Sequence, residues 1–343
     1  MNYRILLTTV FLAVILSFSA TAAGTAEIKN NDVTELTVYA YDSFVGEWGP
    51  GTAIAQAFEK KTGIRVNMVS AGNGGELLTR LEFEKSSPKA DVIIGISEEL
   101  TSRAIKSGLL ESYASPVLNQ IPQHLIFDST YTLLPFDYGA YSFVYDSETL
   151  TEVPSSLEDL LDPKYQGKVI IMDPRTSSVG MGLLQWTIAV YGDEYLQWWE
   201  KVKDNLLTIA DGWSSGYGLF TEGEAPLVLS YTTSPVYHKM WEESDRYQAT
   251  VFEEGNYLAI EGAGILKSSS NREEAEAFID FLLSDAQRDI ATTNIMFPVN
   301  RNTVLDEAFS IAPEVTRNLL LDNELVSTMR DSWVDEWVEV MSR

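Results

Sequence analysis

Aromatic side chains beside glycines are the residues of this sequence whose types and spacing could do chemistry. They fall in three segments that we expect to be loops, residues 39–51, 211–218 and 230–237, each placed where a predicted strand ends. Stacked rings with carboxylates nearby suit a flat, positively charged ligand, because a cation over an aromatic face gains about 0.5–2 kcal/mol. The carboxyl ends of parallel strands are where ligands bind in open α/β sheets. The pattern leaves two interpretations open, a binding site and core packing of the same rings.

Catalytic and metal-binding motifs are scarce. The 343 residues include two histidines and no cysteine, and contain no G-x-S-x-G, H-E-x-x-H or Walker-type motif. Residues 72–75 (Gly-Asn-Gly-Gly) resemble a phosphate loop in composition only. They are either a tight strand-to-helix turn or a backbone site for a polar end of the ligand. We expect no catalytic residue, no metal site, no cofactor and no enzymatic activity. The rival is an exported enzyme using carboxylates such as Asp137 and Asp173.

The charge balance is strongly acidic. The chain has 24 basic and 50 acidic residues, a formal net charge of −26. Nucleic acid and anionic membrane surfaces are poor partners for such a field, whereas a cationic ligand is attracted to it. Net acidity also keeps an exported protein soluble, so the charge alone identifies no ligand.

The first residues have the pattern of a secretory signal peptide. Basic Arg4 precedes an apolar run at residues 5–18, and residues 20–22 (Ala-Thr-Ala) form a cleavage-type triplet. We expect residues 1–23 to be removed and residues 24–35 to be a disordered lead-in. The mature protein is then periplasmic and soluble, and the absence of cysteine predicts no lipid anchor.

Strand and helix patterns alternate through the mature chain, which predicts an α/β fold with parallel strands. Its length favours two lobes. Expected strands lie at residues 36–40, 64–69, 90–95, 141–145, 168–172 and 227–230. Expected helices lie within residues 48–63, 77–81, 97–107, 154–161, 180–191, 194–205, 273–284 and 319–341. Gly63 and Gly108 are the expected helix stops, and Trp333 and Trp337 are expected to face the core.

Six ordered motifs together resemble the periplasmic thiamine-binding proteins of ABC importers. They lie at residues 36–44, 48–51, 135–139, 173–177, 212–214 with 217–220, and 229–235. The resemblance implies the two-lobed type II periplasmic binding-protein fold with a ligand cleft between the lobes. Lobe 1 is expected to contain residues 36–137 and 258–297, and lobe 2 residues 138–257 and 298–343. Residues 135–146 and 257–267 are the expected crossover strands.

Ligand-binding residues follow from the resemblance, motif by motif. It implies that Tyr41 and Trp48 line the first lobe and that Ser177 meets the phosphate or hydroxyethyl end of thiamine. The residues expected to enclose the pyrimidine and thiazolium rings are Trp213, Tyr231 and Tyr237.

Two positions depart from the family pattern. Asn73 stands where the family commonly has an acidic residue, and it remains a candidate ligand-binding residue. Ile295 stands where the family has tryptophan, so one side of the pocket is expected to lose a ring.

The function implied is capture of thiamine, or thiamine phosphates, for an ABC importer permease with its ATPase. The protein is expected to act as a monomer and to bind no nucleic acid. A ferric-iron or other small-ion receptor of the same fold is the alternative, since clustered tyrosines can ligate iron.

Overall fold

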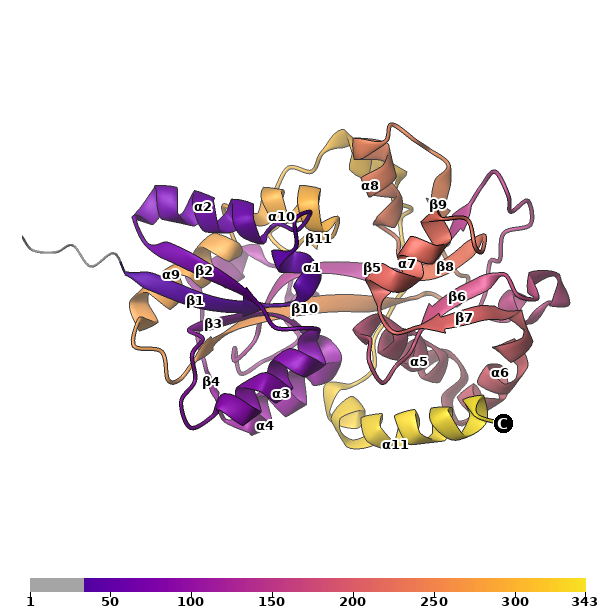
Figure 1. Cartoon of the computed structure of the whole chain (residues 1–343), viewed down its shortest axis with the longest axis horizontal. Coiled ribbons are helices and arrows are strands. Elements are labelled where there is room, and N and C mark those ends of the chain that lie inside the picture. Colours follow the sequence, from indigo (N-terminus) through magenta and orange to yellow (C-terminus); the bar gives the residue numbers. More distant parts are fainter. Residues whose placement is uncertain (1–33) are drawn as a thin grey trace, which may run out of the picture. The chain divides into compact units, whose positions relative to one another are not determined.

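The structure, a computed structural model, describes residues 34–343, which belong to one compact unit (Figure 1). The predicted signal peptide and the lead-in up to residue 33 lie outside the described residues. Glu35, expected to be in the lead-in, is the first residue of the first strand.

Twelve strands of the described residues form a sheet with a central order of β2-β1-β3-β10-β5-β8-β6-β7. Their bounds are β1 (Glu35–Ala40), β2 (Arg65–Ser70), β3 (Val92–Ser97), β4 (Leu110–Glu111), β5 (Leu134–Asp146), β6 (Val169–Met172), β7 (Leu206–Ala210), β8 (Leu227–Tyr231), β9 (Tyr247–Ala249), β10 (Asn256–Leu266), β11 (Phe297–Pro298) and β12 (Asn318–Leu319). β1 is parallel to β2 and β3, and β6 is parallel to β7 and β8. The predicted parallel α/β arrangement is therefore confirmed at both ends of the sheet.

Two long strands occupy the middle of the sheet. β5 pairs antiparallel with β10 through its first half and with β8 through its second half. β10 also pairs antiparallel with β3. The segments predicted as crossovers are thus strands, and β5 is shared between the two halves of the sheet (Figure 1).

Helices follow most of the strands. Their bounds are α1 (Asp42–Val45), α2 (Gly51–Thr62), α3 (Gly74–Glu84), α4 (Thr101–Ser107), α5 (Ser178–Tyr191), α6 (Tyr195–Val202), α7 (Trp213–Thr221), α8 (Ser234–Trp241), α9 (Arg272–Leu282), α10 (Gln287–Asn294) and α11 (Asn323–Met341). The predicted stops are confirmed, because α2 ends at Gly63 and α4 at Gly108, both with left-handed backbone (φ +77° and +68°).

The helix predicted for residues 154–161 is wrong. Only a single 3-10 turn forms there, at Asp159–Leu161. The Asp159 carboxylate accepts hydrogen bonds from the backbone N–H and hydroxyl of Ser155, and Glu254 accepts one from the N–H of Leu157. Because carboxylate side chains accept hydrogen bonds from these backbone N–H groups, the segment satisfies them without forming an α-helix.

Apolar side chains gather in separate cores. On the β1–β3 side, Val38 packs in a cluster on one face of the sheet and Tyr39, the next residue, in a cluster on the other face. All six residues of β3 are buried, as expected of a strand covered by helices on both faces. A larger core surrounds β6 and β8 and includes Trp333 and Trp337, which confirms that these two rings face the interior.

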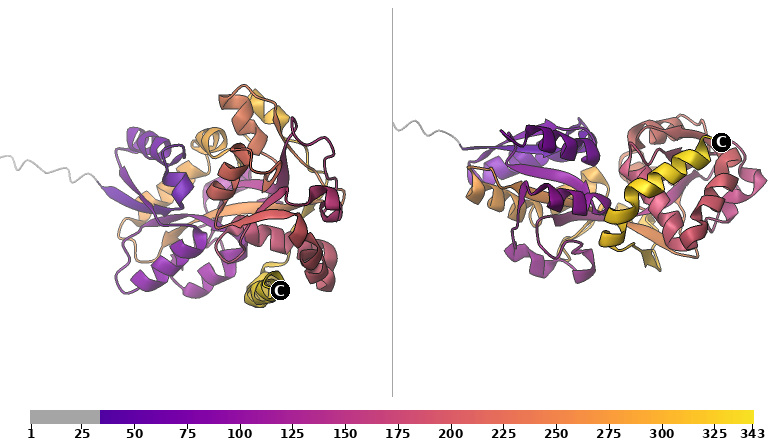
Figure 2. Two further views of the ribbon diagram at one scale, coloured as in Figure 1. Left: turned by 45° about the vertical axis from the view of Figure 1, so that its right-hand side comes forward. Right: turned by 90° about the horizontal axis from the view of Figure 1, so that it is seen from below.

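The C-terminal helix α11 joins elements that are distant in the sequence. Its Ser327 accepts a hydrogen bond from Lys106 of α4 at 2.8 Å, and its Glu336 accepts one from the Tyr195 hydroxyl of α6 at 2.7 Å. Figure 2 shows this helix, in yellow, lying beside both neighbours.

Candidate functional site

Short segments at the ends of five strands are linked, each to the next, by hydrogen bonds. We call these segments together the strand-exit ring. Its members are Tyr41–Asp42 after β1, Gly72–Asn73 after β2, Thr176–Ser177 after β6, Asp211–Trp213 after β7, and Ser230–Tyr231 at the end of β8. The first two segments are joined by the N–H of Asp42, which donates to the Gly72 carbonyl at 3.0 Å, and by the N–H of Gly72, which donates to the Asp42 carboxylate at 3.0 Å.

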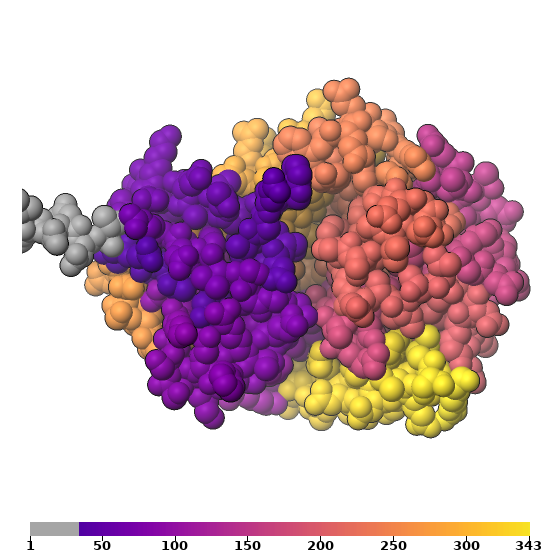
Figure 3. All heavy atoms as spheres, viewed as in Figure 1, coloured from indigo at the N-terminus to yellow at the C-terminus, as the bar shows by residue number. Residues whose placement is uncertain are grey.

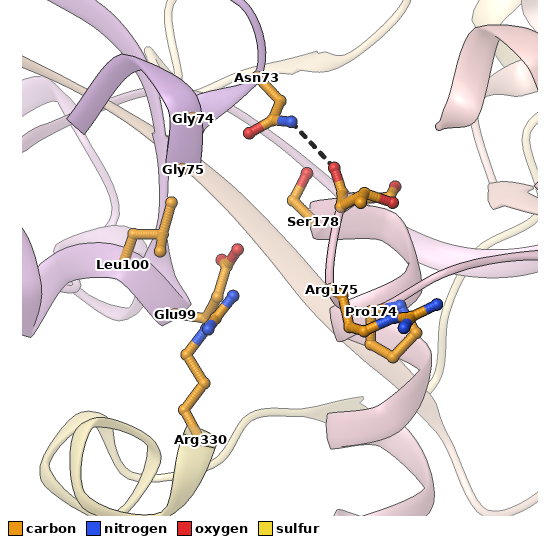
Figure 4. Close-up of a pocket in the computed structure, with 11 residues that line it drawn as sticks. Asn73, Gly74, Gly75, Glu99, Leu100, Pro174, Arg175, Ser178 and Arg330 are labelled. Atoms are coloured by element: carbon orange, nitrogen blue, oxygen red, sulfur yellow. Dashed lines mark hydrogen bonds between the residues drawn. The ribbon is translucent and has the colours of Figure 1, made fainter. Parts of the chain in front are cut away.

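Asn73 connects the β2 exit to the β6 exit. Its side-chain oxygen caps α3 by accepting from the N–H of Glu76 at 3.0 Å, while the Glu76 carboxylate accepts from the N–H of Asn73 at 2.9 Å. Its amide nitrogen donates to the carbonyl oxygen of Thr176 at 2.9 Å (Figure 4). The Thr176 hydroxyl in turn donates to the carbonyl oxygen of Asp211 at 2.7 Å, which extends the ring to the β7 exit.

A pocket lies where these exits meet. The residues around it include Gly75 at the start of α3, Ser177 and Ser178 at the start of α5, Glu99, and Arg330 of α11 (Figure 4). The first N–H groups of a helix have no intrahelical partner and carry partial positive charge, so two helix N-termini beside a guanidinium suit an anionic group.

Ser177 is the N-cap residue of α5. Its hydroxyl accepts from the N–H of Gly180 at 3.5 Å, which is a long contact, so capping leaves most of its hydrogen-bonding capacity unused. Arg175, two residues earlier, is engaged by Asp173 through a bidentate pair. Burial raises the pKa of Asp173, but hydrogen bonds from Arg175 outweigh this and lower it.

Trp213 begins α7 and is half-buried. Its indole N–H donates to the Ser230 hydroxyl at 2.7 Å, which joins the β7 exit to the β8 exit. One face of its ring stacks on Tyr217 with centroids 5.0 Å apart, and Tyr217 stacks in turn on His238 at 6.0 Å. The Tyr217 hydroxyl hydrogen-bonds His238 at 2.9 Å, and Glu242 hydrogen-bonds the opposite ring nitrogen of His238 at 2.7 Å. Trp213 is therefore backed on one face by a stack of two further rings.

Tyr231 is the second stacked ring. It lies on Tyr141 with centroids 5.2 Å apart, and Tyr141 stacks on Tyr257 at 6.4 Å. Gly139 lies alongside, and a Cβ there would come 3.5 Å from the Tyr231 ring. Burial, followed by the charges of Glu261 and Asp137, raises the pKa of the Tyr231 hydroxyl well above its ordinary value.

Tyr41 lies against the backbone of β3 at Gly95, where any Cβ would collide with the Tyr41 ring. Its hydroxyl hydrogen-bonds the Asn294 side chain, which also donates to Asp137 at 2.6 Å. Burial, followed by Glu261 and Asp137, raises the pKa of Tyr41 well above the ordinary value, as it does for Tyr231. The two tyrosines are therefore next to the same two carboxyl groups, of which Asp137 is fully buried.

Trp48 and Tyr237 are predicted site residues that take no part in the hydrogen bonds and ring stacks of the strand-exit ring. Trp48 is 81% exposed, and no aromatic contact joins it to another site residue within residues 34–343. Tyr237 is 40% exposed and meets the edge of His238 at 5.3 Å, so it lies behind the Trp213 stack. Both remain predicted ligand-binding residues.

One sequence-based expectation needs correction. Trp213 and Tyr237 were expected in loops but belong to α7 and α8. Ile295, where one side of the pocket was expected to lose a ring, is 9% exposed and packs with Val236, Ala291 and Phe309. It also adopts a left-handed backbone (φ +54°), which is costly for a β-branched residue.

Sequence reasoning missed the buried acids beside the ring. Glu98 and Glu99 directly follow β3, and Glu261 lies opposite Asp137 in the β5–β10 pair. Glu98 and Asp137 are fully buried, and burial is the first cause that raises the pKa of both. The position of Glu98 and Glu99 directly after a buried strand could have marked them as candidates. Glu261 carried no local signal.

Figure 3 shows a hollow between the indigo and purple N-terminal residues and the salmon residues around α7. Among residues 34–343, no cluster of histidine and acidic side chains has a metal-binding arrangement. No helix in this part of the chain is long and apolar enough to cross a membrane.

Known proteins share this sequence and fold. The family model for bacterial extracellular solute-binding proteins matches residues 87–320. The thiamine-binding periplasmic protein of Brucella abortus is 41% identical over 90% of this chain and 92% of its own length. That of Escherichia coli is 41% identical over 90% of this chain and 94% of its own. A solved periplasmic thiamin binding protein superposes with a TM-score of 0.85 at 40% identity, covering 90% of this chain and 96% of that one. The chain therefore belongs to the periplasmic thiamine-binding proteins, within the family of bacterial extracellular solute-binding proteins.

Proposed function

We propose that this chain captures thiamine, or a thiamine phosphate, and delivers it to an ABC importer. The observation that carries the proposal is the strand-exit ring. It combines two supported aromatic rings, a buried acidic cluster beside Tyr41 and Tyr231, and two helix N-termini at the pocket beside Asn73. Thiamine has matching parts, namely two flat rings, one of them cationic, and a hydroxyethyl arm that can carry phosphate.

The aromatic side of the ring is suited to the pyrimidine and the thiazolium. Trp213 and Tyr231 are linked through Ser230, and each is backed by a further ring, so both are held without a ligand. A flat cation stacked on such faces gains both dispersion and cation–π attraction.

The polar side is suited to the hydroxyethyl or phosphate end. We assign this end to Asn73 and Ser177, because their helices α3 and α5 both begin at the pocket that Arg330 borders. Glu99 counts against a phosphate at this place, since its carboxyl group borders the same pocket. Arg330 acts on Glu99 to lower its pKa, although burial outweighs this and keeps that pKa raised.

Ligand capture would involve closure of two lobes, 36–137 with 258–297 and 138–257 with 298–343, about β5 and β10. Trp48 and Tyr237 are then side chains at the rim that complete the enclosure of the ligand. The strands that join the halves support this proposal, because β5 pairs with strands of both.

The proposed location is the periplasm, with residues 1–23 as the signal peptide that directs export. The proposed partners are a membrane permease and its ATPase, with the binding protein acting as a non-enzymatic monomer. The family membership supports both proposals, since the relatives compared are periplasmic binding proteins.

Tryptophan fluorescence tests the placement of the ligand. Thiamine should quench the emission of the purified mature protein, and Trp213→Phe should remove most of the quenching. Trp241→Phe is the matched control, because Trp241 is 60% exposed at the end of α8 and belongs to no contact of the ring. Quenching that survives Trp213→Phe would place the ligand elsewhere.

A further inference from the structure

Asp137 and Glu261 lie directly opposite each other on two antiparallel strands. The register of β5 and β10 pairs them, with a bulge immediately after Glu261. Opposed residues of an antiparallel pair project to the same face, with Cβ atoms about 4.5–5.5 Å apart. The strand register therefore places the two carboxyl-bearing side chains next to each other on one face of the sheet.

The hydrogen bonds around this pair are incomplete. One oxygen of Asp137 accepts from Asn294 at 2.6 Å, but its other oxygen and one oxygen of Glu261 are buried without a donor. Asp137 itself is fully buried. Two ionised carboxylates would repel each other at this position. If one of the two groups keeps a proton, its O–H can donate a hydrogen bond to an oxygen of the other group, so fewer buried oxygens lack a partner.

The groups around the pair are acidic side chains and uncharged tyrosine hydroxyls. Glu98 and Glu99 approach from the end of β3, Tyr41 from the end of β1, and Tyr231 from β8. Arg330 of α11 acts on Glu99, but no salt bridge within residues 34–343 joins a basic side chain to Asp137 or Glu261. Burial above all raises the pKa of both carboxyl groups, that of Glu261 to about 7.

We infer that Asp137 and Glu261 share one proton in the ligand-free protein and release it to solvent when a cationic ring binds beside Tyr41 and Tyr231. The pair then carries the counter-charge of the ligand, and it is a specificity-determining element that favours flat organic cations over neutral analogues. The inference rests on the proposed function, because it requires the thiazolium to bind at the aromatic side of the strand-exit ring.

Proton release makes affinity depend on pH in a defined direction. A nearby positive charge stabilises the carboxylate form, so ligand and proton compete for the pair. Where one full proton is displaced, affinity falls about tenfold for each unit by which the pH is lowered. Because the two groups interact strongly, the titration belongs to the pair and not to either residue alone.

Calorimetric titration with thiamine in two buffers that differ in ionisation enthalpy tests this directly. Near the Glu261 pKa of about 7, the observed binding enthalpy should differ between buffers by an amount that corresponds to net proton release. Asp137→Asn, and independently Glu261→Gln, should reduce the number of protons released and flatten the pH dependence of the dissociation constant. Ligand-free melting establishes that each variant is folded.

Asp146→Asn is the matched control. Asp146 is a buried carboxylate on the same strand, but Arg246 pairs with it at 2.7 Å and lowers its pKa, so it has no proton to release near neutral pH. This variant should keep the wild-type proton count.

The outcomes separate the two proposals. Thiamine binding with the same heat in both buffers and a constant affinity between about pH 6 and pH 8 would overturn the shared proton while leaving thiamine capture intact. Undetectable thiamine binding by the folded wild-type protein would instead overturn the proposed function. The wild-type buffer comparison decides the inference even if neither variant folds.

Discussion

The side-chain amide of Asn73 donates a hydrogen bond to the backbone carbonyl oxygen of Thr176 at 2.9 Å, and so joins the β2 exit to the β6 exit. A carboxylate at position 73 could cap α3 equally well but could not donate this bond. Position 73 is also one of the two at which we expect this chain to depart from the family pattern. The amide therefore provides a contact across the pocket that an acidic residue would replace with repulsion.

Asn73→Asp should weaken binding of thiamine monophosphate more than binding of thiamine. The new charge would border the pocket assigned to phosphate, where two like charges about 4 Å apart repel by roughly 1–4 kcal/mol, depending on solvent exposure. Calorimetry with both ligands measures the difference. Asn73→Ser is the control, since serine keeps the cap, adds no charge and is too short to replace the amide. Equal losses for both ligands in Asn73→Asp would contradict the placement of the phosphate.

Ser177→Ala should also discriminate between the two ligands. Loss of the hydroxyl should cost thiamine monophosphate about 1–2 kcal/mol more than thiamine, the range expected for a hydrogen bond to a charged group. Because Ser177 caps α5, Ser177→Gly is a useful second variant that removes the hydroxyl at a capping cost of only a few tenths of a kcal/mol. A loss of melting temperature without ligand discrimination would mean that Ser177 serves the helix alone.

Trp213→Ala and Tyr231→Ala separate ligand stacking from core packing. Each ring has one face covered by another ring, so each substitution should reduce thiamine affinity, by about 1–3 kcal/mol on the scale of stacking and cation–π contacts. A fully buried aromatic would instead cost about 3–5 kcal/mol of folding free energy when truncated. Ligand-free unfolding in denaturant, compared with calorimetry, gives the two quantities for each variant. A large stability loss with unchanged affinity would show that the rings are only structural.

Ile295→Trp should destabilise the ligand-free protein instead of adding a ligand contact. Ile295 is enclosed by Val236, Ala291 and Phe309, and overfilling a packed cluster costs about 1–3 kcal/mol. Thermal melting and thiamine titration of this variant measure both effects. Tighter thiamine binding with an unchanged melting temperature would show that position 295 borders the ligand after all.

The buried acids should make the ligand-free protein less stable as the pH rises towards neutrality. The pKa of Glu261 is raised to about 7 and that of Asp137 is raised by burial, so the folded state holds these protons more tightly than the unfolded chain does. Their contribution is complete below the unfolded values of about 4 and is lost as the pH rises through the folded pKa. Thermal melting of wild type and Asp137→Asn between about pH 5 and pH 8 measures it.

Comparing wild type with Asp137→Asn separates the effect of the Asp137–Glu261 pair from the effect of the protein's overall negative charge. Net negative charge also falls on acidification, and it falls in both proteins. Asp146 and Asp159, whose pKa values are lowered, act in the opposite direction and at lower pH. Identical slopes in wild type and Asp137→Asn would contradict the raised pKa of the pair.

Local patterns predicted the elements of this fold well where short-range physics decides them. Gly63 and Gly108 ended their helices as expected because a left-handed residue is a local requirement. The strand at Val92–Ser97 was predictable from a continuous apolar run. By contrast, α7 contains Gly216 and Gly218, which indicated a loop. Gly216 is there because a Cβ would meet Met172 and Ala210, a packing constraint with no sequence signature.

The candidate site divides in the same way. Tyr41, Trp213 and Tyr231 could be named because aromatic residues at strand ends form a local pattern. The pairing of Asp137 with Glu261 depends on the register of two strands distant in the sequence, and the contact of Asn73 with Thr176 depends on how separate strand exits meet. Neither relationship can be read from residue spacing.

Calorimetric titration of the purified mature protein with thiamine, in parallel with ferric iron, tests the central proposal most directly. We expect saturable binding of one thiamine per chain and no saturable heat with iron. Binding of ferric iron without any response to thiamine would contradict it, and would make the tyrosines of the strand-exit ring metal ligands instead of stacking surfaces.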